Sequence, residues 1–285
     1  MILAPFSPQK PMTFEAAVTL LRTRPNGVRL LQEAYLDANP REAAVRFAAS
    51  GEFAEALRLL SPAARGIIVD LGAGNGIATY AFAQAGAAQV IAIEPDPSPL
   101  VGRRAIENIT VGLPVETMDA LAERLPLPNL SVDIVYVRQA LHHLHDLPGA
   151  CREFYRVLRP GGVVLACREP VVDSPAQLRR LLASHPIHRL TGSEGAYPLP
   201  EYLVAFKMAG FELKHIWGHW DSVINAHPTV GTAAELAVYP AAWLSRRLGP
   251  IGRLLGRFAL FRGLAYRWLS RSVPGRLYTF LAQKT

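Results

Sequence analysis

The chain has few of the residues that build disulfide or metal frameworks, since only two cysteines occur among its 285 residues. Cys151 and Cys167 form no metal-binding or redox spacing, so we interpret them as core residues. No uncharged run reaches the roughly 18 residues of a membrane span. Residues 1–11 lack the charged-then-apolar order of a signal peptide. These absences predict a cytoplasmic protein, and the 50% apolar content predicts a substantial core.

Acidic residues are scarce in the C-terminal part of the chain. From Ser222 onward there are nine Lys or Arg and one acid, Glu235, so this part carries about +8 of a chain whose net charge is +7. Residues 1–221 are therefore close to neutral. Electrostatic attraction to a partner would come from the C-terminal segment.

What the sequence does contain is a glycine-rich stretch, residues 67–76, which read IIVDLGAGNG. The apolar, β-branched beginning is typical of a strand buried on both faces of a parallel sheet. The glycines permit a tight turn and let backbone N–H groups approach a ligand closely. Because an Ala-rich, helix-compatible segment follows, the loop would lead into a helix N-terminus. This pattern indicates a nucleotide-cofactor loop.

From residue 66 onward strand-like and helix-like segments alternate, which predicts an α/β fold with helices on both faces of a parallel sheet. The predicted strands are 66–71, 88–94, about 113–117, 132–138, 162–167, 211–216 and 276–282, and the predicted helices are 76–86, 98–108, 119–124, 147–158 and 201–208.

The remaining segments extend this core domain, residues 62–285. Residues 1–61 read as helices, one capped by Thr13 and one beginning at Asn39-Pro40. They predict either a helical cover beside the sheet or a lid that contacts substrate. The stretches 171–199 and 222–275 are longer than ordinary connections, so we expect long insertions that act as lids or binding elements.

Two carboxylates narrow the choice of cofactor. Glu94 ends the second predicted strand, where a carboxylate can accept hydrogen bonds from both ribose hydroxyls. Asp70 stands two residues before Gly72, where it would repel a pyrophosphate but suit a cationic amino-acid group, directly or through water. It could equally accept hydrogen bonds within the loop. The glycine spacing also departs from the dinucleotide fingerprint, which disfavours an NAD-linked oxidoreductase.

The glycine loop, Glu94, Met118-Asp119, the SVDIVYVRQALHHL stretch and VLRPGG together resemble a class I S-adenosylmethionine-dependent methyltransferase. Within that family the chain is similar to the ubiquinone/menaquinone-methyltransferase-like small-molecule group. The resemblance covers about residues 62–170. It implies a Rossmann-like, doubly wound seven-stranded sheet of order 3-2-1-4-5-7-6, with the seventh strand antiparallel.

The resemblance also implies site residues. Gly72, Ala73, Gly74 and Gly76 would shape the pocket around the methionine part of S-adenosylmethionine (AdoMet), and Glu94 would hold the ribose. Met118 and Asp119 would contact the adenine. Arg138 and Gln139 stand where the family closes over the methyl-bearing sulfur. The residues implied for the cofactor are therefore Asp70, Gly72, Ala73, Gly74, Gly76, Glu94, Met118, Asp119, Arg138 and Gln139.

Histidines are the candidate general bases, because imidazole titrates near neutral pH. His142, His143 and His145 follow the fourth strand, and we favour His143, with His142 second. A structural role for the pair is the alternative. We predict no metal site, since no acidic partners are evident near these histidines in the sequence.

The segment 240–274 contains seven arginines and no acid. On a helical wheel Leu254, Phe258 and Trp268 share a face opposite several arginines, although Arg262 falls within that face. Three interpretations stay open: helices that cap the sheet or form a dimer interface, a peripheral membrane contact, and a pocket for an anionic substrate.

The sequence thus predicts an AdoMet-dependent methyltransferase that acts on a small or lipophilic molecule. The alternative is a non-catalytic methyltransferase-like protein that binds partners or serves as a membrane-associated assembly factor. Nucleic acid is disfavoured as substrate, since no base-methylation motif and no groove-reading module occur. The acceptor atom and the oligomeric state do not follow from the sequence.

Overall fold

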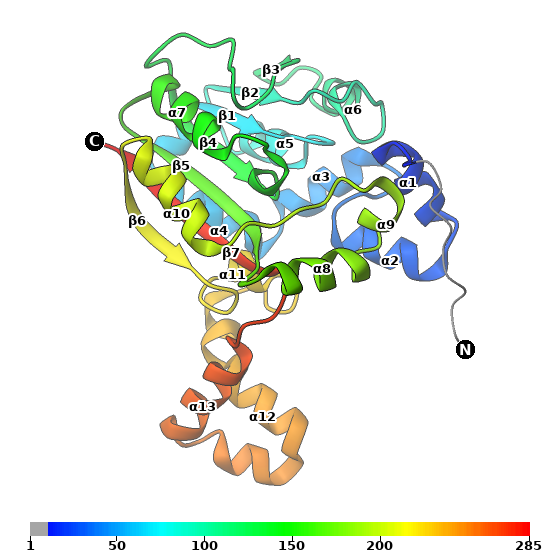
Figure 1. The fold of residues 1–285 in the computed structure, drawn as a ribbon, viewed down its shortest axis with the longest axis vertical. Coiled ribbons are helices and arrows are strands. Elements are labelled where there is room, and N and C mark those ends of the chain that lie inside the picture. Colours follow the sequence, from blue (N-terminus) through cyan, green and yellow to red (C-terminus); the bar gives the residue numbers. More distant parts are fainter. Residues whose placement is uncertain (1–10) are drawn as a thin grey trace.

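A seven-stranded sheet forms the centre of the protein, as a computed structural model of residues 11–285 shows (Figure 1). The strand order is β3-β2-β1-β4-β5-β7-β6, and β7 runs antiparallel to both of its neighbours. The predicted doubly wound sheet is confirmed, including the last strand between the fifth and sixth. The strands are β1 (Ile67–Leu71), β2 (Gln89–Ile93), β3 (Val115–Met118), β4 (Val132–Arg138), β5 (Leu158–Val171), β6 (Phe211–Trp217) and β7 (Arg276–Lys284).

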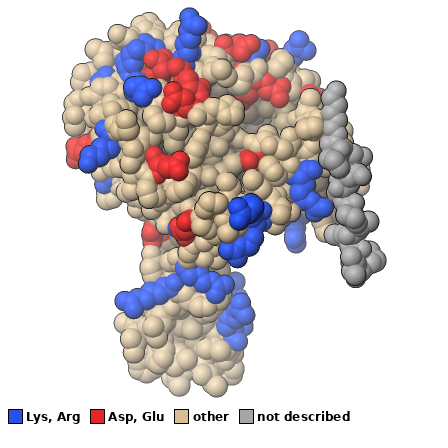
Figure 2. Space-filling view, viewed as in Figure 1, with Lys and Arg blue, Asp and Glu red and all other residues tan. Residues whose placement is uncertain are grey.

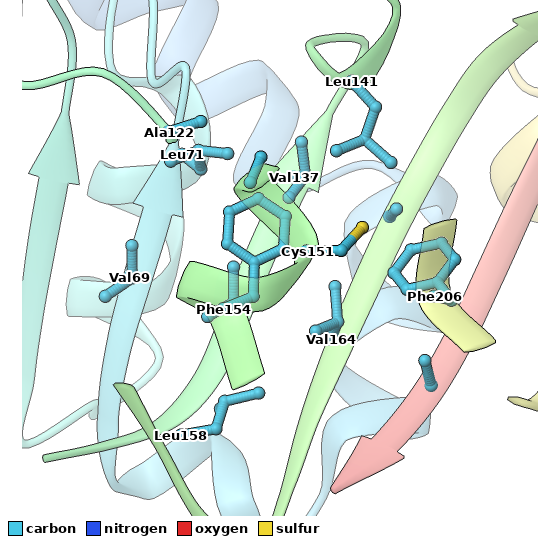
Figure 3. Close-up of a cluster of buried hydrophobic side chains, with 14 of the residues drawn as sticks. Val69, Leu71, Ala122, Val137, Leu141, Cys151, Phe154, Leu158, Val164 and Phe206 are labelled. Atoms are coloured by element: carbon cyan, nitrogen blue, oxygen red, sulfur yellow. The ribbon is translucent and has the colours of Figure 1, made fainter. Parts of the chain in front are cut away.

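Helices cover both faces of the sheet, because alternate side chains of each strand point to opposite faces. On one face Val69 packs in a core with Phe154 of α7 and Phe206 of α10 (Figure 3). On the other face the neighbouring residue, Ile68, packs in a second core with Phe82 of α5. The helices that connect the strands are α5 (Ile77–Gln84), α6 (Arg103–Ile109), α7 (Leu147–Val157) and α10 (Leu199–Met208).

The N-terminal helices begin where their capping residues predicted. The Thr13 hydroxyl accepts a hydrogen bond from the N–H of Ala16, and the Asn39 side chain accepts one from the N–H of Arg41. Helices α3 and α4 pack into the second core, whereas α1 and α2 contribute to a smaller cluster with Ile187. Residues 1–10 of the predicted cover lie outside the described residues. The elements are α1 (Phe14–Arg22), α2 (Pro25–Glu33), α3 (Pro40–Ala48), α4 (Gly51–Leu60) and the 3₁₀ turn η1 (Ala63–Arg65).

The predicted helix at 119–124 is wrong. The segment forms turns closed by a bridge between Leu121 and Arg124. Tertiary contacts hold the backbone that follows in an open form, since Arg156 donates to the carbonyl oxygens of Leu125 and Leu127. A helix of about six residues is too short to compete with such contacts.

The fifth strand is longer than predicted. It begins directly after α7 and includes the Arg-Pro-Gly-Gly sequence, in which Gly161 has a φ of +78°. The pairing with β4 shifts register between Val132 and Ile134. The glycines therefore form an irregularity within β5, at and just before the predicted start of the strand at residue 162.

The two long insertions are mostly helical. Residues between β5 and α10 form two helices beside α1 and α2, and residues between β6 and β7 form three. Of these, α12 and α13 extend away from the body of the molecule, and we call residues 233–269 the arm (Figure 1). The helices are α8 (Pro175–Ser184), α9 (His188–Thr191), α11 (Val223–Ala226), α12 (Ala233–Leu255) and α13 (Ala259–Leu269).

The single helical wheel drawn through 254–268 is wrong, because the arm is not one helix. Non-helical backbone at Gly249 (φ 58°) kinks α12, and residues 256–258 separate it from α13. A glycine of α12 permits close packing within the arm. A Cβ on Gly252 would lie only 2.0 Å from the carbonyl oxygen of Leu244, so the chain folds back on itself there. None of the described helices is both long and apolar enough to span a bilayer.

Candidate functional site

The glycine loop lies between β1 and α5, at the edge of the sheet where the parallel strands end. Gly72 and Gly76 have φ values of +63° and +82°, and Gly76 directly precedes the first residue of α5. A Cβ on Gly76 would approach Ile106 of α6 to 3.0 Å, so the turn and the helix packing both favour glycine. The N–H groups of Gly72 and Ala73 donate to the carbonyl oxygen of Ile93, which ties the loop to the end of β2.

Glu94 follows β2 and is only 9% exposed. One carboxylate oxygen accepts a hydrogen bond from the N–H of Gly74 (2.8 Å), and the other accepts one from the N–H of Asp96 (2.9 Å). Burial raises the pKa of this carboxyl, and the two amides partly offset that effect. Glu94 therefore fixes the shape of the glycine loop and also lines the cavity beside it.

A cavity of about 670 Å³ opens in front of the glycine loop and is mostly apolar where it faces Leu71, Ile93 and Leu121. A second cavity of about 230 Å³ adjoins it, because Gly72, Gly74 and several other residues line both. The residues shared by the two cavities are Phe14, Gly72, Gly74, Val101, Gln139, His143 and Glu194. The two cavities together provide space for a cofactor next to space for a smaller group.

Three of the predicted residues, Gly76, Met118 and Asp119, line neither cavity. Met118 packs against the hydrophobic core, and the Asp119 side chain is 67% exposed and forms an ion pair with Arg103 (3.0 Å). Ala120 and Leu121 line the larger cavity instead. The loop that replaces the predicted helix thus contributes Ala120, Leu121, Ala122 and Glu123 to the lining.

Asp70 lies at the floor of the smaller cavity and is 2% exposed. The Thr79 hydroxyl of α5 donates a hydrogen bond to its carboxylate (2.6 Å). Burial raises the pKa of Asp70 to about 6, and the charge of Glu94 adds to this shift. Asp70 is therefore both a loop-stabilising acceptor and a group that faces the cavity, so the two roles considered for it are compatible.

Arg138 and Gln139, at the end of β4, both line the smaller cavity. The Arg138 guanidinium donates two hydrogen bonds to the Glu52 carboxylate of α4, at 2.6 and 3.1 Å, in a bidentate ion pair. Arg168, on β5, also lies 3.8 Å from Glu52. Burial opposes ionisation of Glu52, but the two guanidinium charges outweigh it and hold the pKa of this carboxyl below its ordinary value. The N-terminal helices are thus tied to the site by a buried charge cluster.

The histidine pair belongs to the 3₁₀ turn η2 (Leu141–His143). Glu169 of β5 accepts a hydrogen bond from Nδ1 of His142 (2.8 Å) and further hydrogen bonds from backbone N–H groups of the turn. Although burial opposes protonation of His142, its bonds to Glu169 and Glu194 raise its pKa to about 9. His142 is therefore a charged, structurally engaged residue.

His143 differs from its neighbour. Its Nδ1 lies 3.1 Å from the carbonyl oxygen of Ser193, which can only accept, so Nδ1 carries the proton. The unprotonated Nε2 lies 3.9 Å from a carboxylate oxygen of Glu194 and can act as a base. Burial and the nearby His142 charge lower the pKa of His143. It lines both cavities. This position and an unprotonated Nε2 are what a general base requires, the role for which we favoured His143.

The insertion 171–199 supplies further residues that line the cavities. Glu194 lines both cavities, and His185 and Ile187 line the smaller one. His142, His143 and Glu194 each offer one ligand atom, all within 4.8 Å of one another, so a divalent cation could bind at this place among residues 11–285. Nothing in the local sequence around the histidines indicates Glu169, which lies near the end of β5, or Glu194.

Residues 69–166 match the family described as methyltransferase domain. An uncharacterized methyltransferase of Mycobacterium tuberculosis is 43% identical over 108 residues, which are 38% of this chain and 42% of the relative. The Escherichia coli ubiquinone/menaquinone biosynthesis C-methyltransferase UbiE is 30% identical over 128 residues, 43% of this chain and 51% of the relative. A crystal structure of an S-adenosylmethionine dependent methyltransferase from Mesorhizobium loti shares the fold, with a TM-score of 0.56 and 20% identity over 84% of this chain and 100% of the other.

The chain shares its fold with this solved methyltransferase, and residues 69–166 are similar to a methyltransferase domain. It spans about half the length, or less, of the curated relatives it matches. The methyltransferase domain at 69–166 contains the glycine loop, Glu94 and the histidine pair. The N-terminal helices, Glu194 and the arm lie outside residues 69–166, so the domain match includes the glycine loop and the histidine pair but not these parts.

Proposed function

We propose that this protein transfers the methyl group of AdoMet to a small or lipophilic acceptor. The observation that carries the proposal is the lining of the larger cavity, to which Glu94, the glycine loop and His143 all contribute. AdoMet would extend along the glycine loop with its ribose at Glu94. The acceptor would occupy the adjoining space near Gln139 and His143.

Methyl transfer from AdoMet mainly requires that the protein align the acceptor with the methyl group. AdoMet, when bound, supplies a methyl group already activated on a sulfonium. The acceptor's lone pair forms a bond to the methyl carbon while the carbon–sulfur bond breaks and its electron pair returns to sulfur. Where the acceptor must lose a proton, Nε2 of His143 accepts it. The remaining protein groups orient the two partners and exclude water.

A lipophilic acceptor fits the walls of the smaller cavity. Phe14 of α1, Leu36 and Ile187 line it opposite the polar groups of the histidine turn. The name of the Escherichia coli relative, a ubiquinone/menaquinone biosynthesis C-methyltransferase, also favours an apolar acceptor. These three residues come from the helical cover and the first insertion, which supports a role for both segments as lids.

Isothermal titration with AdoMet, S-adenosylhomocysteine and NAD tests the cofactor assignment. We expect both sulfur compounds to bind and NAD not to bind. Release of S-adenosylhomocysteine on adding a panel of phenolic and quinol acceptors then measures transfer. Binding without turnover on any acceptor would favour the non-catalytic alternative, and binding of neither sulfur compound would overturn the proposal.

A further inference from the structure

The arm extends from the same edge of the sheet at which the candidate site lies. Strand β6 ends at Trp217 and leads through α11 into the arm, and β7 begins at Arg276 after the arm. Arg276 pairs with Val171, the last residue of β5, and Arg138 at the end of β4 pairs with Cys167 in β5. The carboxyl ends of the parallel strands and both roots of the arm are therefore neighbours.

The arm is also connected to the insertion that lines the cavity. Asp173, just before α8, forms an ion pair with Arg276 at 2.5 Å, and the Ser272 hydroxyl also donates to it. The Gln177 side chain of α8 donates to the Ser272 hydroxyl (2.8 Å). The root of the arm thus holds the start of the segment that carries His185 and Glu194 to the cavity.

The far end of the arm exposes large apolar side chains. The exposed fractions are 66% for Ile251, 55% for Leu254, 54% for Phe258, 69% for Leu260 and 50% for Leu264. We call these five residues the apolar tip. A cluster of this kind on a projecting element indicates an interaction site, since single exposed apolar residues are ordinary but contiguous patches are not.

Arginines and aromatic rings lie on the same arm. Arg247 stacks near both Trp243 and Trp268, at 5.7 Å from each ring centroid, and Arg271 lies 3.8 Å from the Trp268 centroid. The two tryptophan rings contact each other at 4.7 Å. In Figure 2 a band of Lys and Arg surrounds the arm near the body, while the far end shows no charged side chains in this view. Tryptophan and arginine beside an apolar surface are typical of the boundary between lipid head groups and acyl chains.

The arm's arginines have no acidic partners within the described part of the chain. No salt bridge among residues 11–285 involves Arg246, Arg247, Arg253 or Arg257, and all four are exposed. A partner that approaches this surface must therefore supply negative charge. A second copy of the arm would bring arginines against arginines, which disfavours a dimer through this face.

Arg262 is the exception in the apolar pattern, and its contacts explain why it can lie there. Its guanidinium donates to the carbonyl oxygens of Gly256 and Arg257, at 3.2 and 3.0 Å. These carbonyls follow the C-terminus of α12, where a positive charge is favourable. Arg262 therefore closes the turn between the two helices and leaves the apolar tip intact.

We infer that the arm docks on the surface of an anionic lipid bilayer, with the apolar tip among the acyl chains and the arginines on the phosphates. Because the arm leaves the site-bearing edge of the sheet, docking would bring that edge toward the bilayer, and the acceptor would be a lipophilic molecule drawn from it. This statement about the acceptor rests on the proposed function, whereas the docking itself does not.

Flotation with vesicles of phosphatidylcholine, alone or mixed with phosphatidylglycerol, tests the docking. We expect the protein to float with the mixed vesicles at about 0.05 M salt and to bind much less at about 0.5 M, where charges are screened. The variant Leu254→Ser/Phe258→Ser should bind at least about tenfold more weakly, because two large apolar side chains no longer insert. Arg246→Gln/Arg247→Gln should weaken binding to the mixed vesicles alone.

Matched controls come from other parts of the surface. Val111→Ser replaces an apolar side chain that is 80% exposed outside the arm, and Arg29→Gln removes an exposed arginine of α2. Neither should change flotation. Equal binding of the tip variant and the unchanged protein, or no binding at low salt, would overturn the inference. So would a dimer in solution that the tip variant converts to a monomer without any vesicle binding.

Titration with AdoMet separates this inference from the proposed function. The tip variant should bind AdoMet as the unchanged protein does, which also shows that it is folded. If the unchanged protein binds AdoMet but no vesicles, the docking is contradicted and the proposed function is not. Vesicle binding without any AdoMet binding contradicts the proposed function and leaves the docking in place.

Discussion

Replacing Glu52 tests the buried charge cluster that joins the N-terminal helices to the site. Glu52 is fully buried in α4, and its carboxylate is shared by Arg138 at 2.6 Å and Arg168 at 3.8 Å. The change Glu52→Gln keeps the shape of the side chain and removes its charge. Two buried guanidinium groups would then lack a counter-charge, since their other contacts are to backbone oxygens and to Gln139.

The expected cost is large for a single substitution. Breaking a buried ion pair by removing one partner costs about 3–5 kcal/mol, against a total stability of about 5–15 kcal/mol for a folded domain. With a urea dependence of about 3 kcal/mol per molar, the unfolding midpoint should fall by about 1–1.7 M. Urea unfolding followed by circular dichroism measures this shift.

Glu55→Gln is the matched control on the same helix. Glu55 pairs with Arg58 at the surface, where such pairs contribute less than about 1 kcal/mol. We expect its midpoint to stay close to that of the unchanged protein. If Glu52→Gln lowers the free energy of unfolding by less than about 1 kcal/mol, the reasoning is refuted, because the guanidinium groups would then be solvated by water.

Ionisation of the Glu52 carboxyl also makes the stability of the protein depend on pH. The pKa of Glu52 in the folded protein lies below its ordinary value of 4.5. Its contribution to stability is therefore complete above about pH 4.5 and is lost as the pH falls through the lower folded value. Glu52→Gln should flatten the acid side of the stability profile, and an unchanged acid limb would contradict the assignment.

The remaining predictions concern the cavity. Glu94→Gln should weaken AdoMet binding about 10- to 100-fold in a titration, since a charged hydrogen-bond acceptor contributes about 1.5–3 kcal/mol; unchanged affinity would count against the ribose assignment. His143→Asn should lower the rate of transfer about 10²- to 10⁴-fold on an acceptor that must lose a proton, with AdoMet binding unchanged; an unaltered rate would exclude a base at this position. Asp70 has a pKa of about 6, so the affinity for cationic AdoMet should rise with pH through that value and Asp70→Asn should abolish the dependence; a titration series from acid to neutral pH measures it. Treatment with a chelator should leave transfer intact, because protonated His142 already places a positive charge between Glu169 and Glu194; loss of activity restored by a divalent cation would show that the cluster holds a metal.

Local sequence was sufficient for the elements that carry the cofactor. The glycine loop, the apolar strand before it and the carboxylate at Glu94 are each set by a few adjacent residues. The strand order came from the resemblance, since no local pattern states that β7 lies between β5 and β6. Caps such as Thr13 and Asn39 also located helix starts, because each satisfies backbone N–H groups within its own turn.

Long-range contacts explain what the sequence did not indicate. Glu52 is 86 residues from Arg138, and Glu169 is 27 residues from His142. The acidic partners whose absence we inferred near the histidines therefore exist, but they come from β5 and from the insertion that contains Glu194. The helix predicted at 119–124 failed for a related reason, since its surroundings are decided by Arg156 from another helix.

Buried carboxylates lie near the ends of β1, β2 and β5 at one edge of the sheet, and each is held by a different partner. Asp70 accepts from Thr79, Glu94 accepts from two loop amides, and Glu169 accepts from the histidine turn. Burial favours the neutral forms of Asp70 and Glu94, so the pKa values of these two carboxyls rise. A ligand with positive charge near this edge would relieve part of that cost by favouring the ionised carboxylates. The sulfonium and amino groups of AdoMet supply such charge, whereas the pyrophosphate of a dinucleotide would add repulsion at the same place.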